Sequence, residues 1–283
     1  MHPLRPVRLL AISAFLFTAC LQAQNILFVG NSFTFVPSPL DIGTVTDLNA
    51  GKPGGVPAIF EVLAVAGGKT PTVSMETVGG KTLQFHYETK RELIDKAWDI
   101  VILQDYSTGP IPEANGGTKS FDSFRAHVPK LKELFTAQNP KVKIWLYETW
   151  ARPDVVMKGR FATIEDMQAG LRSAYSAAAK DNALQGWVPV GDTFLAAVKQ
   201  GLADNPATPD SEGPLKIWGK DNYHQSAIGA YISALLFYGR IYDADPRDLP
   251  SDNAAAVRIK LSTEDSKKLQ ALAWEQLQLV KQP

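Results

Sequence analysis

Short apolar runs alternate with helix-length segments along most of the chain, and this alternation restricts the fold more than any other feature. The clearest run is Ile-Val-Ile-Leu at residues 100–103, which is typical of a strand buried on both faces of a parallel sheet. Four similar candidates occupy residues 26–29, 72–77, 142–147 and 187–190. Strands that alternate with helices favour right-handed crossovers and a parallel sheet. We therefore predict an α/β fold with a doubly wound, five-stranded parallel sheet.

The segments between these strands supply the expected helices. They cover residues 56–66, 83–97, 121–137, 164–182, 193–202 and 225–242, with a last helix from Ser262. Asp265 follows Ser262 at the spacing of a capping box. Residues 37–57 are rich in Gly and Pro, so we expect a loop there. A chain of 283 residues without an internal repeat is compatible with one large domain, which we place at residues 24–283.

The first residues have the pattern of a secretory signal peptide. Arg5 and Arg8 precede a short apolar run at residues 9–17, and small residues follow it. We predict a signal peptide at residues 1–23 and an exported protein, either periplasmic or secreted. The single cysteine, Cys20, leaves two alternatives open. The Phe-Thr-Ala-Cys that ends at Cys20 resembles a bacterial lipobox and would leave a lipid anchor, whereas cleavage at the end of the predicted signal would discard this cysteine.

Charge and motif content argue against several classes of partner. The chain has 29 Lys+Arg and 29 Asp+Glu, so its formal net charge of +0 offers no basis for nucleic-acid binding. Gly-Gly-Lys-Thr occurs at residues 67–70 and 79–82, but both copies lack the earlier glycine of a phosphate-binding loop, so we predict no nucleotide. No His/Cys cluster has the spacing of a metal site. We expect no metal and no cofactor.

A serine on the turn after the first strand is the first candidate for chemistry. Gly30-Asn31-Ser32 interrupts the apolar run, at the strand end where α/β sheets place their reactive groups. Asp221 lies three residues before His224, so its carboxylate can reach the imidazole within one turn and orient it. A histidine held in this way can take a proton from a serine hydroxyl. A helix cap with a surface histidine is the alternative interpretation of the same spacing.

Taken together, these motifs resemble the SGNH/GDSL hydrolase superfamily. Gly30-Asn31-Ser32 matches the first block of that superfamily, Gly79-Gly80 the second, and Asp221 with His224 the last, in the family order. The motif Gly-Asn-Ser-Phe-Thr at residues 30–34 is similar to that of an exported bacterial branch of the superfamily. The resemblance implies a flavodoxin-like three-layer α/β/α sandwich. It also implies a triad in which Ser32 is the nucleophile, His224 the base and Asp221 the partner of that base.

The third family block departs from this pattern. Members carry Gly-x-Asn-Asp after the third strand, with the asparagine donating to the oxyanion, whereas this chain has Gln104-Asp105-Tyr106-Ser107. By resemblance, the oxyanion donors are the backbone N–H groups of Ser32 and Gly80, and we assign the third donor to Gln104. The alternative is that Gln104 satisfies the backbone at a strand end. Loss of one donor lowers the rate on the order of 10²–10³-fold, so without Gln104 an enzyme would be slow or specialised.

Three further residues are candidates for substrate binding. Trp150 and Arg152 follow the fourth predicted strand, at the same sheet edge as Ser32. Trp150 has the chemistry to stack on a sugar ring and Arg152 to bind a carboxylate. The alternative is aromatic packing beside a surface arginine. His86 follows Gly80 by six residues and is either a substrate contact or a partly buried structural histidine.

The resemblance implies an exported serine esterase that hydrolyses acyl esters without a cofactor. Acetyl or short-chain esters on carbohydrate are the first expected substrates, and lipid or thioester hydrolysis is the alternative within the class. The missing third block motivates a different interpretation, in which a catalytically weak or inactive SGNH fold binds a glycan or envelope component. The expected partner is a small-molecule or glycan ester, with membrane contact only through an anchor on Cys20.

Overall fold

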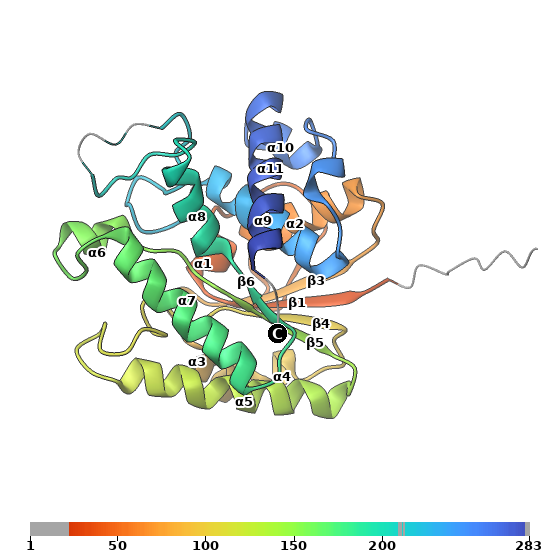
Figure 1. Ribbon diagram of the computed structural model, residues 1–283. Helices are drawn as coiled ribbons and strands as arrows, with labels where there is room; N and C mark the ends of the chain where they lie inside the picture. The colour runs from red at the N-terminus through yellow and green to blue at the C-terminus, as the bar shows by residue number, and fades with distance from the viewer. Residues whose placement is uncertain (1–22, 209–210, 212, 281–283) are drawn as a thin grey trace, which may run out of the picture.

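A six-stranded sheet forms the centre of the protein, as a computed structural model describes it for residues 23–208, 211 and 213–280 (Figure 1). The strand order is β2-β3-β1-β4-β5-β6, and every neighbouring pair is parallel. The strands are β1 (Asn25–Gly30), β2 (Thr46–Asp47), β3 (Thr72–Thr77), β4 (Ile100–Leu103), β5 (Lys143–Tyr147) and β6 (Gly186–Val188). Without the short β2, this is the flavodoxin-like 2-1-3-4-5 order. The predicted α/β class and parallel sheet are confirmed.

Helices cover both faces of the sheet. They are α1 (Ser32–Phe35), α2 (Gly55–Ala66), α3 (Leu83–Thr89), α4 (Arg91–Ile94), α5 (Lys119–Gln138), α6 (Pro153–Met157), α7 (Ile164–Asp181), α8 (Val190–Lys199), α9 (Ala227–Tyr242), α10 (Ala254–Arg258) and α11 (Thr263–Leu279). Figure 1 shows α2, α8, α9 and α11 on one face, with α3, α4, α5 and α7 toward the other. The chain leaves β1 in one direction across the sheet and adds β4, β5 and β6 in the other. Right-handed crossovers therefore place the connecting helices on opposite faces.

The sheet has one strand more than predicted. Thr46 and Asp47 lie inside the Gly- and Pro-rich segment 37–57 and pair in parallel with Ser74 and Met75 of β3. The prediction of five strands missed β2 because two residues show no periodic pattern, and the surrounding Gly and Pro residues are typical of loops. The short strand adds an edge to the sheet and leaves the order of the other five unchanged.

Apolar side chains of β1 explain why this strand is central. Residues 26–29 are all fully buried, as expected for a strand with helices on both faces. Phe28 makes edge-to-face contacts with Phe60 of α2 and Phe237 of α9, with ring centroids 5.6 and 5.4 Å apart. Such pairs are worth about 0.5–1.5 kcal/mol beyond the area that they bury. This packing holds β1, and the turn that follows it, in a rigid frame.

The predicted signal peptide at residues 1–23 and its Cys20 lie outside the described residues, apart from residue 23. Within residues 23–208, 211 and 213–280, no helix combines the length and apolar character needed to cross a membrane.

The carboxyl ends of β1 and β4 form the topological switch point of the sheet. The chain leaves β1 toward the α2 face and β4 toward the α5 face, so the connections diverge between two adjacent strands. Sheets of this kind bind ligands in the crevice outside such a point. Ser32 follows β1, Gly80 follows the adjacent β3 and Gln104 follows β4, so three of the predicted site residues lie at this edge.

Candidate active site

The turn that carries Ser32 is built by close approach of the backbone to Gln104. A Cβ on Gly30 would lie 2.5 Å from both Gln104 Oε1 and Thr34 Oγ1, so only glycine fits at the strand end. Asn31 is the N-cap of the single-turn helix α1, and its Oδ1 accepts a hydrogen bond from the Phe33 N–H at 3.0 Å. Ser32 is thus the first residue of α1, one residue after the N-cap and two after the end of β1.

The predicted base and its partner meet Ser32 in space. His224 Nε2 lies 2.9 Å from Ser32 Oγ, and His224 Nδ1 lies 2.7 Å from Asp221 Oδ2. The other carboxylate oxygen of Asp221 accepts the backbone N–H groups of Tyr223 and His224 at 3.1 and 3.0 Å. The loop therefore folds around the carboxylate, which explains the Asp-x-x-His spacing. Ser32 and His224, 192 residues apart in sequence, are within hydrogen-bond distance.

The electrostatics of Asp221 suit the orientation of a histidine. Burial raises the pKa of this carboxyl, but the hydrogen bond from His224 and the two backbone N–H donors outweigh burial and hold the pKa below its ordinary value. Asp221 therefore remains ionised through the neutral range. An ionised carboxylate at Nδ1 favours the tautomer that presents a free Nε2 to the serine, and it stabilises the imidazolium that forms when the proton moves.

The backbone N–H groups of Ser32 and Gly80 have no acceptor among the described residues. Gly80 has φ +71° and faces open space, since an added Cβ would meet no atom within 4 Å. Asn31 Nδ2 donates to the Lys81 carbonyl at 2.9 Å and so fixes the Gly80 loop to the Ser32 turn. Asn31 is a positioning residue that the sequence analysis did not single out, although its place beside the serine was a signal.

Gln104 is held in a way that does not fit the predicted oxyanion role. Its side chain is fully buried, and Oε1 accepts the Asn31 N–H at 2.8 Å and the Thr34 hydroxyl at 2.9 Å. Its Nε2 donates to the backbone carbonyl of Asp105. We therefore correct the assignment of Gln104 as an oxyanion donor, because its amide is directed into the protein. The alternative stated from the sequence, a polar residue that satisfies backbone at a strand end, describes it better.

His86 is not available to a substrate. The side chain is fully buried, its Nδ1 contacts Glu76 Oε2, and Glu76 is itself fully buried. Asn49 Nδ2 donates to the second Glu76 oxygen at 3.0 Å. The prediction of His86 as a substrate contact is wrong because the imidazole is fully buried and contacts Glu76, a buried side chain of β3. Buried polar groups are found hydrogen-bonded, as here.

Trp150 belongs to the aromatic core under the site. Its ring stacks on Phe33 with centroids 4.2 Å apart and on Phe194 at 5.2 Å, and it is fully buried. Its indole N–H donates to the Tyr223 carbonyl at 3.0 Å. The prediction that Trp150 stacks on a sugar is therefore wrong, since both faces of the indole are covered by protein. The residue instead links α1 to the loop that carries His224.

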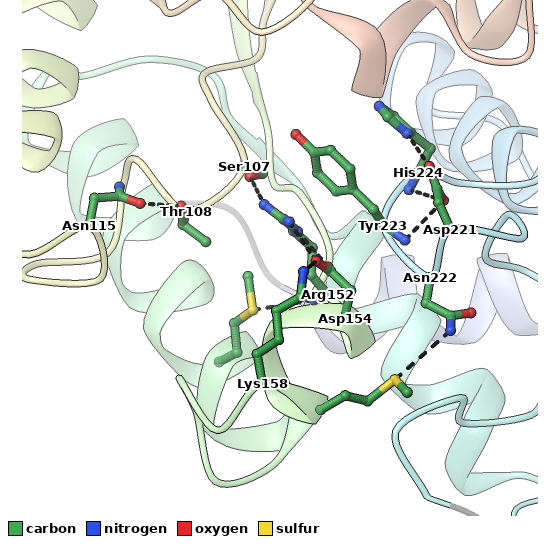
Figure 2. A network of polar contacts seen from close by, with 12 residues as sticks. Ser107, Thr108, Asn115, Arg152, Asp154, Lys158, Asp221, Asn222, Tyr223 and His224 are labelled. Carbon is green, nitrogen blue, oxygen red and sulfur yellow. Dashed lines mark hydrogen bonds and ion pairs between the residues drawn. The ribbon is translucent and has the colours of Figure 1, made fainter.

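Arg152 lies beside the base but is committed to protein partners. Its Nε and Nη2 donate to the two Asp154 oxygens, each at 2.9 Å, and Nη1 donates to Ser107 Oγ at 3.0 Å. The guanidinium carbon is 3.6 Å from the ring centroid of Tyr223, whose ring is next to His224 at 4.2 Å (Figure 2). We correct the prediction that Arg152 binds a substrate carboxylate, because a bidentate ion pair already occupies the guanidinium fork.

Among the described residues, no group of three or more His, Cys, Asp or Glu side chains is arranged to hold a metal ion. The chemistry that the site itself offers is that of a serine hydroxyl, an oriented imidazole and two free backbone donors.

Several solved structures share this fold. A DUF4886 family protein from Bacteroides uniformis has a TM-score of 0.66 and 17% sequence identity, over 92% of this chain and 98% of that one. A putative GDSL-like lipase from Parabacteroides merdae has a TM-score of 0.54 and 15% identity, over 78% and 97%. An acetylxylan esterase from Geobacillus stearothermophilus has a TM-score of 0.52 and 18% identity, over 77% and 94%.

No protein-family model matches the chain, and no curated protein matches it either. At such identities the structural likeness establishes the fold. The similarity to a GDSL-like lipase and to acetylxylan esterases agrees with the resemblance drawn from the sequence motifs. The protein shares the fold of these solved structures, which include a putative GDSL-like lipase and an acetylxylan esterase.

Proposed function

We propose that this protein is a serine esterase that removes acyl groups, acetyl first among them, from ester-linked alcohols. The observation that carries the proposal is the chain of hydrogen bonds from Ser32 Oγ to His224 Nε2 at 2.9 Å and from His224 Nδ1 to Asp221 at 2.7 Å. A serine hydroxyl is a weak nucleophile until an adjacent base takes its proton, and an imidazole oriented by a carboxylate is such a base.

In the first half of the reaction, Ser32 Oγ attacks the ester carbonyl carbon while His224 Nε2 accepts the hydroxyl proton. The resulting tetrahedral oxyanion accepts hydrogen bonds from the Ser32 and Gly80 N–H groups. The intermediate collapses when the bond between carbon and alcohol oxygen breaks, and His224 returns its proton to the leaving alkoxide. In the second half, His224 takes a proton from water, the hydroxide attacks the acyl-enzyme, and Ser32 leaves with that proton.

The oxyanion is stabilised by two backbone donors in this proposal, because the Gln104 amide faces the protein interior. Members of the superfamily with the asparagine of the third block have one more donor, by the resemblance described above. A missing donor is worth about 10²–10³ in turnover. We therefore expect better turnover of activated esters, whose leaving alcohols need less stabilisation of the intermediate.

Carbohydrate acetyl esters are the substrate class that we propose. The support is the structural likeness to acetylxylan esterases and the solvent exposure of the catalytic groups, with side chains 24% exposed for His224 and 49% for Asp221. A bulky, hydrated alcohol such as a polysaccharide can approach an exposed triad. Lipid esters and thioesters are the alternative substrates, and their hydrolysis rates should be measured beside those of acetylated carbohydrates.

Turnover assays with matched serine variants test the proposal. Purified wild type should hydrolyse p-nitrophenyl acetate faster than the butyrate or longer esters, and it should release acetate from acetylated xylooligosaccharides. Ser32→Ala should reduce the rate to background, whereas Ser173→Ala, on the exposed surface of α7, should match wild type. Equal rates for wild type and Ser32→Ala would exclude the esterase.

The departure from the third family block favours a second candidate function, a fold that binds acetylated glycan with little or no turnover. The observation behind it is the absence of a free Gln104 amide at the site. Isothermal titration with acetylated and deacetylated xylooligosaccharides separates the two candidates. Binding of the acetylated form by a wild type that releases no acetate supports the second candidate, and release of acetate excludes it.

We also propose that the protein is exported, on the basis of the residue pattern at positions 1–23. Expression in a bacterial host, fractionation and amino-terminal sequencing test this. A mature terminus after residue 23 in the periplasm or medium indicates free export, and a lipid-modified terminus at Cys20 indicates an anchor. An intact terminus in the cytoplasm contradicts the proposal.

A further inference from the structure

Gln225 directly follows the predicted base and reaches the helix of the predicted nucleophile. Its side chain is 1% exposed. The amide Nε2 donates to the Phe33 carbonyl at 2.9 Å and to the Val36 carbonyl at 3.0 Å. Both acceptors belong to α1 and its C-cap, the turn that begins with Ser32. One amide group therefore joins the two segments that must meet for catalysis.

The short length of α1 explains why this contact matters. A helix leaves its last carbonyls without intrahelical donors, and in a helix of four residues these carbonyls make up most of the turn. The other end of α1 is already fixed, because Asn31 caps it and Gln104 accepts the Asn31 N–H. Gln225 fixes the carbonyl end. Both ends of the nucleophile turn are thus held by side-chain amides from other segments.

The two carbonyl acceptors determine the orientation of the Gln225 amide, because only Nε2 can donate to them. Oε1 lies 3.1 Å from the Ser233 hydroxyl, which shares its proton with the Gly229 carbonyl at 3.1 Å, and Ser233 Oγ accepts the Tyr147 hydroxyl at 3.0 Å. If the amide were flipped, its oxygen would face two carbonyl oxygens and lose both hydrogen bonds. A buried polar network with every member paired specifies one arrangement. The structure therefore holds Gln225 from α9 and β5 and fixes its donors toward α1.

We propose that Gln225 is a positioning residue that sets the distance between Ser32 Oγ and His224 Nε2. This rests on the proposed function for its kinetic consequence, and on the hydrogen bonds alone for its structural consequence. The reacting oxygen and nitrogen are at 2.9 Å, and a displacement of about 1 Å from reacting geometry costs about 100-fold in rate. Without the amide, the turn and the base loop lose two of the hydrogen bonds between them, and we expect them to separate by such a distance.

Gln225→Leu tests the proposal, since leucine keeps most of the volume and removes both donors. The matched control is Gln270→Leu in α11, where a glutamine of 2% exposure donates to the Leu249 carbonyl at 3.1 Å. Both variants should lose thermal stability. Gln225→Leu should lower kcat on p-nitrophenyl acetate about 100-fold with little change in KM, measured well below either melting temperature. Gln270→Leu should keep the wild-type kcat. A kcat that is unchanged in Gln225→Leu, or lowered equally in both variants, would overturn the proposal.

A crystal structure of Gln225→Leu gives a result that does not depend on turnover. The proposal expects the Ser32 Oγ to His224 Nε2 distance to exceed hydrogen-bond range, with the rest of the sheet unchanged. A distance that remains near 2.9 Å would overturn it, even if wild type proves to be an esterase. If wild type has no turnover but the distance increases in the variant, the positioning role stands and the proposed function fails.

Discussion

Replacing Asp105 with asparagine should stabilise the protein at neutral pH and leave its stability at acid pH almost unchanged. Asp105 is 1% exposed and lies directly after Gln104, beneath the candidate site. Its Oδ1 accepts the Leu83 N–H at 3.2 Å and the Tyr106 N–H at 2.6 Å. Asparagine retains an oxygen for these two donors and carries no charge, so the substitution isolates the effect of ionisation.

The magnitude follows from the pKa of the carboxyl. Burial raises the pKa of Asp105 from 3.8 to about 6, against the opposing effects of the Tyr106 and Leu83 N–H groups and of His86. One pKa unit is worth about 1.4 kcal/mol, so ionisation costs the folded state about 3 kcal/mol. Below pH 3.8 the carboxyl is protonated in both states and the cost is absent. The cost grows as pH rises between these two pKa values, because the unfolded chain releases its proton first, and it is complete above about pH 6.

Denaturant unfolding of wild type and Asp105→Asn at a series of pH values measures this difference. The variant should gain about 2 kcal/mol relative to wild type between pH 4 and pH 7.5, because part of the cost is already present at pH 4. Asp154→Asn is a control of opposite sign. Burial raises the pKa of Asp154, but Arg152 and Lys158 outweigh burial and hold it below 3.8, so that carboxylate stabilises the fold at neutral pH and loses this effect in acid. If the difference in the free energy of unfolding between wild type and Asp105→Asn does not vary with pH, ionisation of Asp105 does not destabilise the folded state.

Three further substitutions test the frame of the site. Gln104→Leu should destabilise the protein by about 2–4 kcal/mol, because it leaves the buried Asn31 N–H without an acceptor. The loss should exceed that of Thr34→Val, which removes only the hydroxyl that donates to the same Gln104 oxygen. Equal losses of the free energy of unfolding in urea would contradict this. His86→Ala should lower the free energy of unfolding by about 3–5 kcal/mol, because it removes the partner of one Glu76 oxygen in a fully buried pair. The folded fraction should keep its turnover. Loss of turnover in fully folded protein would show that His86 takes part in the active site. Asp221→Asn should keep the fold and lower kcat on the order of 10⁴-fold, and a kcat near wild type would show that the imidazole needs no carboxylate.

Local spacing predicted the parts of the site whose contacts are local. Asp221 and His224 are three residues apart, and the loop folds so that the carboxylate meets both the imidazole and the backbone N–H groups. Gly30-Asn31-Ser32 follows a buried strand, so its place at the sheet edge follows from the strand itself. The geometry of the sheet then brings distant motifs to one edge, which is why the fold class and these positions were predictable together.

Side chains whose partners lie far away in sequence were harder to place. Trp150 packs between Phe33 and Phe194, and neither neighbour is visible from its own segment. His86 pairs with Glu76 of β3, where apolar and polar residues alternate, a pattern that would place this acid on an exposed face. Gln225 has no motif, because a glutamine beside a histidine is common and only the tertiary structure shows the carbonyls that it reaches.

Covalent labelling tests whether His224 activates Ser32. Wild type and His224→Ala are each treated with a fluorophosphonate, and the modified residue is located by mass spectrometry of proteolytic peptides. We expect a single adduct on Ser32 in wild type and little or none in His224→Ala at the same time points. Modification of another residue, or equal labelling of Ser32 in both proteins, would contradict it.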